Sequence, residues 1–269
     1  GAVQMMLDRG ELKDWFGSTE IWIEATVAVL CLYLFIVHTA TADGGSFFNR
    51  NMLKDANFSA GIVLMFFVGI ILNGTMVLLP TMMQVLLNYP VVTGRFVPAP
   101  RGIGTLVAML FVARLIGKVD TRLVIFTGLA MTAVSLWQMT GFSLQMGMEL
   151  LITSGVLQGF GLGFVFTPLS VVTFSTLPRH YLTQGTALFS LMRNIGGSVG
   201  VSIVEALLVQ NTQIVHSRLV QTLRPDNPLV QSPSFPHIYS LTDPNGIAAL
   251  NAAVTRQAQM IAYLDNFYL

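Results

Sequence analysis

The chain has 269 residues and a formal net charge of +1; 53% of its residues are hydrophobic and only 10% are charged. Soluble domains carry about 25% charged residues, so this chain has too few charged side chains to cover a surface that faces water. The low net charge also argues against the basic surface by which proteins bind nucleic acid. Composition therefore predicts an integral membrane protein that does not bind nucleic acid.

Six stretches are apolar over the length of about 20 residues that a spanning helix needs. In chain order they cover 21–41, a charge-free interval 56–94 with its apolar centre at 60–79, then 96–117, 122–149, 150–177 and 184–210. These stretches predict an all-α fold, a polytopic transmembrane bundle of about six spanning helices.

The sequence turns hydrophilic after the sixth stretch. Residues 211–245 include five of the eleven prolines, which predicts a long loop outside the membrane. Asp243-Pro244 is typical of a helix start. An amphipathic helix is expected to follow, because apolar residues recur at near-helical spacing at Ile247, Leu250, Val254 and Ile261.

Lysine and arginine in short loops predict the orientation, because cytoplasmic loops carry the excess. One set of alternate loops contains Arg50, Lys54, Arg114, Lys118, Arg122 and Arg179. The other set contains Arg9, Lys13, Arg95 and Arg101. This modest bias places the loop 114–122 in the cytoplasm and the proline-rich loop outside.

The sixth stretch carries a polar stripe within a quarter of the helix circumference, formed by Asn194, Ser198, Ser202 and Glu205. Gly197 and Gly200 share a neighbouring face with Arg193. Polar groups in lipid are costly unless they are paired or hydrated, so the stripe and Arg193 are candidates for the lining of a substrate cavity. The glycines would let another helix approach closely. Alternatively, Arg193 and Glu205 reach toward the headgroups and the serines bond to their own backbone.

The fifth stretch contains Gly155, Gly159 and Gly163 at four-residue spacing, followed by Pro168. Small residues at this spacing form a groove for close helix packing. Proline can bend a membrane helix where neighbours satisfy the freed carbonyl. Static packing and a moving hinge both fit this pattern.

The sequence contains patterns that resemble enzyme motifs, but none has the spacing or context that its motif requires. Glycines 159–163 have the wrong spacing for a nucleotide loop, and no strand precedes them. Residues 196–200 formally match a hydrolase nucleophile motif but lie within an apolar helix rather than at a strand-to-helix turn. The four histidines are far apart and lack metal-ligand spacing. We therefore expect no enzyme, no metal site and no cofactor.

The loop 114–122 is short, and besides its cations it contains Gly117 and Asp120. Such a turn can form a charge network against the helix ends. A loop that merely sets topology would explain Arg114 and Arg122, but not Gly117 and Asp120.

Five segments together resemble the drug:proton antiporters of the EmrB/QacA type, in the fourteen-helix branch of the major facilitator superfamily: 7–16, 99–104, 114–122, 157–168 and 185–195. The resemblance covers the C-terminal half of such a protein, truncated at both ends. It implies that 114–122 is the cytoplasmic gating loop, with Arg114, Gly117, Asp120 and Arg122 as its functional residues.

The same resemblance divides the chain into three parts. Residues 1–58 would be the end of an upstream helix, an outer loop, an inserted transmembrane helix and a cytoplasmic loop. Residues 59–210 would be five spans of the C-terminal bundle. Residues 211–269 would be the extracytoplasmic proline-rich loop and the start of a cut final helix. The sequence departs from the family at Ala113, at 41–46, and at 91–98, which is one residue short and contains Arg95.

The implied function is export of drugs or other amphiphilic small molecules, cationic or neutral, by alternating access. A proton gradient would drive it, and the proton-carrying carboxylate is expected in the N-terminal half. The expected location is the bacterial inner membrane, as a multi-pass protein. Expected partners are the lipid bilayer, an N-terminal six-helix half and the substrates, with a periplasmic adaptor as a further candidate. The alternative is a non-transporting membrane fragment that packs against other helices.

Overall fold

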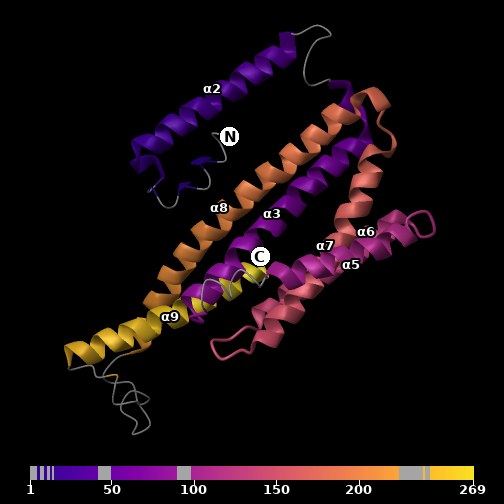
Figure 1. The fold of residues 1–269 in the computed structure, drawn as a ribbon. Helices are drawn as coiled ribbons and strands as arrows, with labels where there is room; N and C mark the ends of the chain where they lie inside the picture. Colours follow the sequence, from indigo (N-terminus) through magenta and orange to yellow (C-terminus); the bar gives the residue numbers. More distant parts are fainter. Residues whose placement is uncertain are drawn as a thin grey trace.

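The computed structural model describes residues 5–6, 9–10, 13, 15–41, 50–89, 98–223, 239 and 243–269. Within these residues the regular secondary structure is helical (Figure 1). The long helices are α2 (Thr19–Thr41), α3 (Ala56–Val85), α5 (Pro98–Leu115), α6 (Thr121–Thr140), α7 (Met148–Ser175), α8 (Leu182–Thr222) and α9 (Pro244–Tyr268). Short 3₁₀ turns lie at η2 (Trp15–Gly17), η3 (Arg50–Lys54) and η4 (Arg179–Tyr181).

The all-α membrane fold is confirmed, because each of the six apolar stretches overlaps one of the helices α2, α3, α5, α6, α7 and α8. In the described part of the chain, 4 helical segments are both long and apolar enough to cross a bilayer. These are Ala56–Val85, Thr121–Thr140, Met148–Ser175 and Arg179–Thr222. The departures at 41–46 and 91–98, including Arg95, lie almost entirely outside the described residues.

Helix α8 is longer than predicted. The prediction placed the end of this span near Gln210, but the helix continues to Thr222. Residues 211–222 contain neither glycine nor proline, and the first proline beyond them is Pro225. At 1.5 Å per residue the 41 residues of α8 extend about 60 Å. This is about twice the thickness of a bilayer core, so part of α8 extends beyond the membrane.

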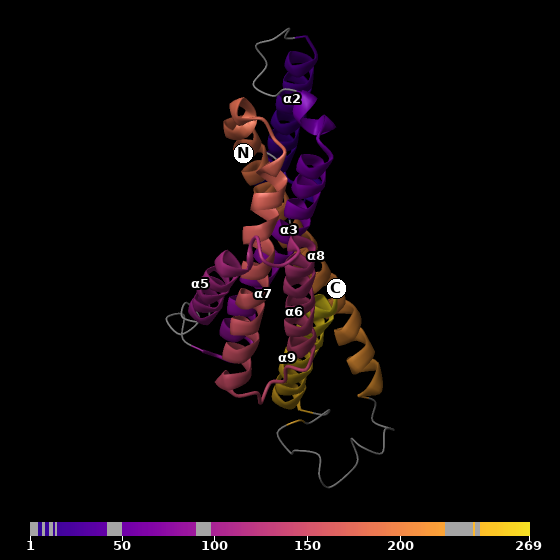
Figure 2. The ribbon, with the colours of Figure 1, turned by 90° about the vertical axis from the view of Figure 1, so that its right-hand side faces the viewer.

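Helix α7 is central to the bundle and packs against α3, α5 and α6. Helix α3 also packs along α8, and the two run side by side over most of their length (Figures 1 and 2). Helix α9 packs against α8 and α6. The packed neighbours are joined through α3 and α7: α3 runs parallel to α8 and α5 parallel to α7, whereas α6 runs antiparallel to α7.

Two buried apolar clusters set the register between α3 and α7. In the first, which we call the α9 cluster, Leu78, Leu79 and Met82 of α3 meet Leu151 of α7 and Met260 and Phe267 of α9. In the second, the α3–α7 cluster, Met65 and Val68 of α3 meet Leu162, Val165 and Leu169 of α7. Residue numbers rise along α3 as they fall along α7, so the two helices are antiparallel.

Helix α2 lies beside the bundle and packs mainly on η2 (Figure 1). Its large apolar side chains are exposed around the helix; they include Trp22, Ile23, Val29, Leu30, Leu32 and Tyr33. Such a continuous apolar surface is unfavourable in water and favourable in lipid. The structure thus gives α2 the surface of a lipid-facing helix.

Candidate functional site

The glycines of α7 allow α5 to approach its backbone. A Cβ atom on Gly159 would meet the backbone of Arg101, and one on Gly163 would lie 2.9 Å from the carbonyl oxygen of Thr105. The Thr105 hydroxyl donates a hydrogen bond across this contact to the carbonyl oxygen of Gly159, at 3.0 Å. Gly155 differs, since a Cβ there would find nothing within 4 Å. Only two of the three glycines in the predicted stripe therefore lie at a close contact.

Two further close contacts, one on α7 and one on α8, involve glycines outside the predicted packing sets. On α7, Gly161 faces Gly128 of α6, and a Cβ on either would come within 2.8 Å of the other's carbonyl oxygen. On α8, Gly196 meets the backbone of Phe66 of α3. Gly161 and Gly196 belong to glycine-rich runs, which indicate close helix packing. The spacing alone does not show which glycines of a run face a neighbouring helix.

The two glycines predicted to pack α8 lie against α3. A Cβ on Gly200 would lie 2.6 Å from the carbonyl oxygen of Ile70, and one on Gly197 would meet the side chain of Asn73. Pro168 is buried within α7, which remains helical from Met148 to Ser175. These residues hold the helices together.

The polar stripe of α8 is divided between different surroundings. Ser198 and Ser202 are buried, at 4% and 7% exposure, while Asn194 is exposed and Glu205 is half-buried. The Arg193 guanidinium lies 5.9 Å from the centre of the Phe166 ring on α7, within reach of a cation–π interaction. The stripe thus presents Asn194 to the surface of this chain and its two serines to the interior.

The loop between α5 and α6 is a tight turn. Gly117 has φ +87°, a left-handed conformation that glycine adopts without steric cost. Asp120 caps α6 and accepts a hydrogen bond from the backbone N–H of Arg122, at 3.0 Å. Arg114, Asp120 and Arg122 are exposed, and within the described residues no ion pair joins them. The turn therefore accounts for Gly117 and Asp120 without the charge network that the sequence suggested.

Arg101 corrects the prediction that counted it among the loop cations. It belongs to α5 and is only 5% exposed. Its Nη1 donates to the Thr75 hydroxyl at 3.1 Å, and its Nη2 donates to the carbonyl oxygen of Leu72 at 3.3 Å. No described acidic side chain forms an ion pair with it. Hydropathy alone does not predict the burial of Arg101, because its neighbours on α3 are far away in sequence.

A small apolar pocket adjoins Arg101 between α3, α5 and α7. Its volume is about 180 Å³, and it is lined by Val68, Leu72, Thr105, Met109, Leu162 and Phe166. Leu72 provides the carbonyl oxygen that Arg101 binds, and Thr105 lies one turn along α5. The pocket thus brings apolar space close to a buried cation.

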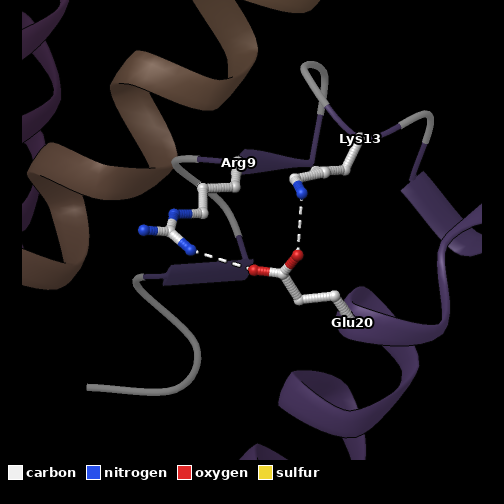
Figure 3. Close-up of polar contacts among 3 residues, drawn as sticks. All are labelled: Arg9, Lys13 and Glu20. Atoms are coloured by element: carbon white, nitrogen blue, oxygen red, sulfur yellow. Dashed lines mark hydrogen bonds and ion pairs between the residues drawn. The ribbon is translucent and has the colours of Figure 1, made fainter.

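Polar contacts also join the ends of the helices. Arg256 of α9 donates to the carbonyl oxygen of Leu86 at the end of α3, through Nε at 3.1 Å and Nη2 at 2.5 Å. Near the start of α2, Glu20 forms ion pairs with Arg9 at 2.9 Å and Lys13 at 2.8 Å (Figure 3). The hydrogen bond from Lys13 and its charge, with Arg9 in addition, lower the pKa of Glu20 from its ordinary value.

Comparison with known proteins agrees with this architecture. A family model described as Major Facilitator Superfamily matches residues 12–201. The chain is 29% identical over 273 residues to the Multidrug export protein EmrB of Haemophilus influenzae and 28% identical over 276 residues to that of Escherichia coli. It is 28% identical over 269 residues to the Fatty acid resistance protein FarB of Neisseria gonorrhoeae. These alignments cover 99–100% of this chain and 53% of each relative, so the chain spans about half the length of the curated relatives it matches.

Proposed function

Because this chain belongs to the Major Facilitator Superfamily, we propose that it forms the C-terminal part of a proton-driven transporter that exports amphiphilic small molecules by alternating access. The superfamily consists of transporters, so the role of the chain is transport rather than catalysis. The observation that carries the proposal is the alignment of the whole chain with one half of two multidrug export proteins. The fatty acid resistance relative supports amphiphiles as the substrate class.

The packing supports a rigid-body mechanism. Alternating access moves one helical bundle against another around a central site. Glycine contacts hold α5 to α7 and α8 to α3 at backbone distance, which favours movement of these helices as a unit. In this proposal Asn194, Arg193 and Glu205 contribute to the cavity wall, where α8 meets the other half of the transporter. Ser198 and Ser202 are buried within this chain and do not reach that wall.

The remaining partners belong to the same proposal. The full-length protein would lie in the bacterial inner membrane and be driven by the proton gradient. Its N-terminal six-helix half would supply the proton-carrying carboxylate. A periplasmic adaptor is a further proposed partner.

The test is transport by the full-length protein in proteoliposomes. With an imposed pH gradient, we expect uptake of ethidium into vesicles with an acidic lumen and its loss on addition of a protonophore. Glu205→Gln tests whether that carboxylate takes part in proton coupling, and unchanged pH dependence would exclude it. Protein without any pH-dependent uptake of ethidium, or of dodecyltrimethylammonium as a second probe, would contradict the proposed function.

A further inference from the structure

Arg101 lies near the middle of the bundle rather than at its edge. Although it is in the first turn of α5, its hydrogen bonds reach Leu72 and Thr75, close to the midpoint of α3, Ala56–Val85. Its backbone lies against Gly159, close to the midpoint of α7, Met148–Ser175. A side chain at this depth cannot place its charge in the headgroup region as arginines near helix ends do.

A second unusual polar side chain lies at the same depth. Gln158 of α7 is fully buried, and neither its Nε2 nor its Oε1 has a hydrogen-bond partner among the described residues. On α7 it lies between Leu151, which belongs with Leu78 and Leu79 to the α9 cluster, and Leu162, which belongs with Met65 and Val68 to the α3–α7 cluster. The antiparallel register therefore places Gln158 at the level of residues 72–75 of α3. We call Thr75, Arg101 and Gln158 the Arg101 layer; it separates the α9 cluster from the α3–α7 cluster.

The hydrogen bonds of the Arg101 layer are incomplete. A guanidinium group has five N–H donors, and only two of those of Arg101 have an acceptor in the described chain. Both acceptors are neutral, so no described residue compensates the positive charge of Arg101. An unpaired cation inside a membrane protein is costly, and intramembrane ionisable groups usually pair or mark a functional site. Residues 90–97, which precede α5, contain no acidic residue that could supply the missing charge.

We propose that the Arg101 layer is a binding site for one carboxylate group. The planar guanidinium can donate two parallel hydrogen bonds to a carboxylate, and the Gln158 amide supplies a further donor at the same level. The carboxylate comes either from an exported acid or from an acidic side chain in the part of the transporter outside this chain. In the first case the proposal rests on the proposed function and adds amphiphilic acids to its substrates.

The adjoining pocket fits such a ligand. Its lining is apolar except for Thr105 and includes Leu72, whose carbonyl oxygen accepts a hydrogen bond from Arg101. An amphiphilic acid could place a hydrocarbon group there and its carboxylate at the guanidinium. An amphiphilic cation would be repelled at the same position, so the charge of Arg101 would distinguish the two classes.

The experiment compares two ligands of equal chain length, dodecanoate and dodecyltrimethylammonium, binding to the purified full-length protein in nanodiscs. The variants are Arg101→Met, which removes the charge, and Arg256→Met as a matched control. Arg256 also donates to a backbone carbonyl of the α3 segment, but at its end. If the ligand supplies the carboxylate, Arg101→Met weakens dodecanoate binding by about tenfold or more, the value of a charge-assisted hydrogen bond. Binding of dodecyltrimethylammonium stays within about twofold, and Arg256→Met changes neither affinity.

The melting temperature tests whether the carboxylate comes from an acidic side chain of the transporter itself. If an acidic side chain of the protein occupies the layer, Arg101→Met leaves that carboxylate buried and unpaired, and the melting temperature falls by several degrees. A second change of that one acidic residue to its amide then restores the melting temperature. Arg101→Met with unchanged dodecanoate affinity and an unchanged or raised melting temperature would overturn the proposal, because an apolar side chain would then replace the cation without loss.

The outcomes also separate this site from the proposed function. A wild-type protein that transports neither ethidium nor dodecyltrimethylammonium contradicts the proposed transport function. The melting temperature of Arg101→Met still tests the carboxylate site in that case. Should Arg101→Met fail to fold, Arg101→Lys takes its place, since lysine keeps the charge but cannot form the planar fork. Dodecanoate affinity or the melting temperature must then fall, and no change in either would overturn the proposal.

Discussion

Individual residues in this bundle matter through what lies opposite them on the next helix. Gly155 and Gly159 are one helical turn apart on α7 and look equivalent in the sequence. Gly159 lies against the backbone of Arg101, whereas space for a Cβ remains at Gly155. The same side chain, alanine, should therefore have opposite effects at the two positions.

We expect Gly159→Ala to lower the free energy of unfolding by about 1–3 kcal/mol, because the backbone of α5 must move to accommodate the methyl group. Gly155→Ala should be neutral or stabilise by up to about 1 kcal/mol, since alanine is the better helix former. Thermal unfolding of the full-length protein in detergent measures both. Equal melting temperatures for the two variants would be inconsistent with the α5–α7 contact.

Asp55 is a second residue whose role depends on its surroundings. It caps α3 and accepts hydrogen bonds from the backbone N–H groups of Asn57 at 2.9 Å and Phe58 at 3.1 Å. The Thr176 hydroxyl and these two amides lower its pKa from the ordinary value of 3.8. Because the folded state favours the carboxylate, this stabilisation is present above pH 3.8 and is lost as pH falls through the lower pKa of the folded state.

Asp55→Ala should therefore cost about 1 kcal/mol of stability at neutral pH. Asp55→Asn should keep most of the cap, since asparagine is an equally good N-cap residue, but lose the acid dependence. Unfolding measured between pH 7 and pH 3 tests this. An asparagine variant that loses stability in acid as steeply as the wild type would show that another group is responsible.

At the scale of elements, the turn between α5 and α6 joins two helices that both pack on α7. Asp120 and Gly117 shape this turn, and Arg114 and Arg122 extend into solvent. A turn whose cations form no ion pair with a described residue can bind the other half of the transporter when the bundles close. This geometry is compatible with the proposed gating role, which stays a prediction.

We predict that Arg114→Ala and Asp120→Ala abolish drug resistance conferred by the full-length protein without lowering its expression. Resistance in an efflux-deficient bacterium and the amount of protein in the membrane are the two measurements. Lys118→Ala, in the same turn, is the control and should retain resistance.

Asp120→Asn separates the two roles of this residue, because it keeps the helix cap and removes the charge. Loss of resistance in this variant would assign function to the charge, and full resistance would assign it to the cap. Normal resistance in both alanine variants would contradict the gate assignment.

At the scale of the whole molecule, the bundle has a closely packed centre and two peripheral helices. Helices α3, α5, α6, α7 and α8 are joined by backbone-close glycine contacts and buried apolar clusters. Helix α2 contacts mainly η2, and α9 is held by the α9 cluster and by the bond from Arg256 to Leu86. Motion between the halves of a transporter would thus carry the five central helices together.

The membrane class, the six apolar stretches and the family resemblance could all be read from the printed residues. Hydropathy is a property of contiguous segments, and a spanning helix satisfies its own backbone, so long-range information is not needed. The sequence does not predict the end of α8, because the polar residues in 211–222 are typical of a loop. Contact with α9 supports this extension, where His216 Nε2 lies 3.0 Å from Asn251 Oδ1.

Other properties depend on which segments meet at the same depth, and these only the packed bundle specifies. Arg101 reads as a loop cation in the sequence, yet Leu72 and Thr75 of α3 draw its side chain into the interior. Likewise, of the three regularly spaced glycines on α7, two lie at close helix contacts and Gly155 does not. In the polar stripe of α8, the two serines are buried and Asn194 is exposed. Periodicity defines the faces of a helix, but the register of its neighbours determines what each face touches.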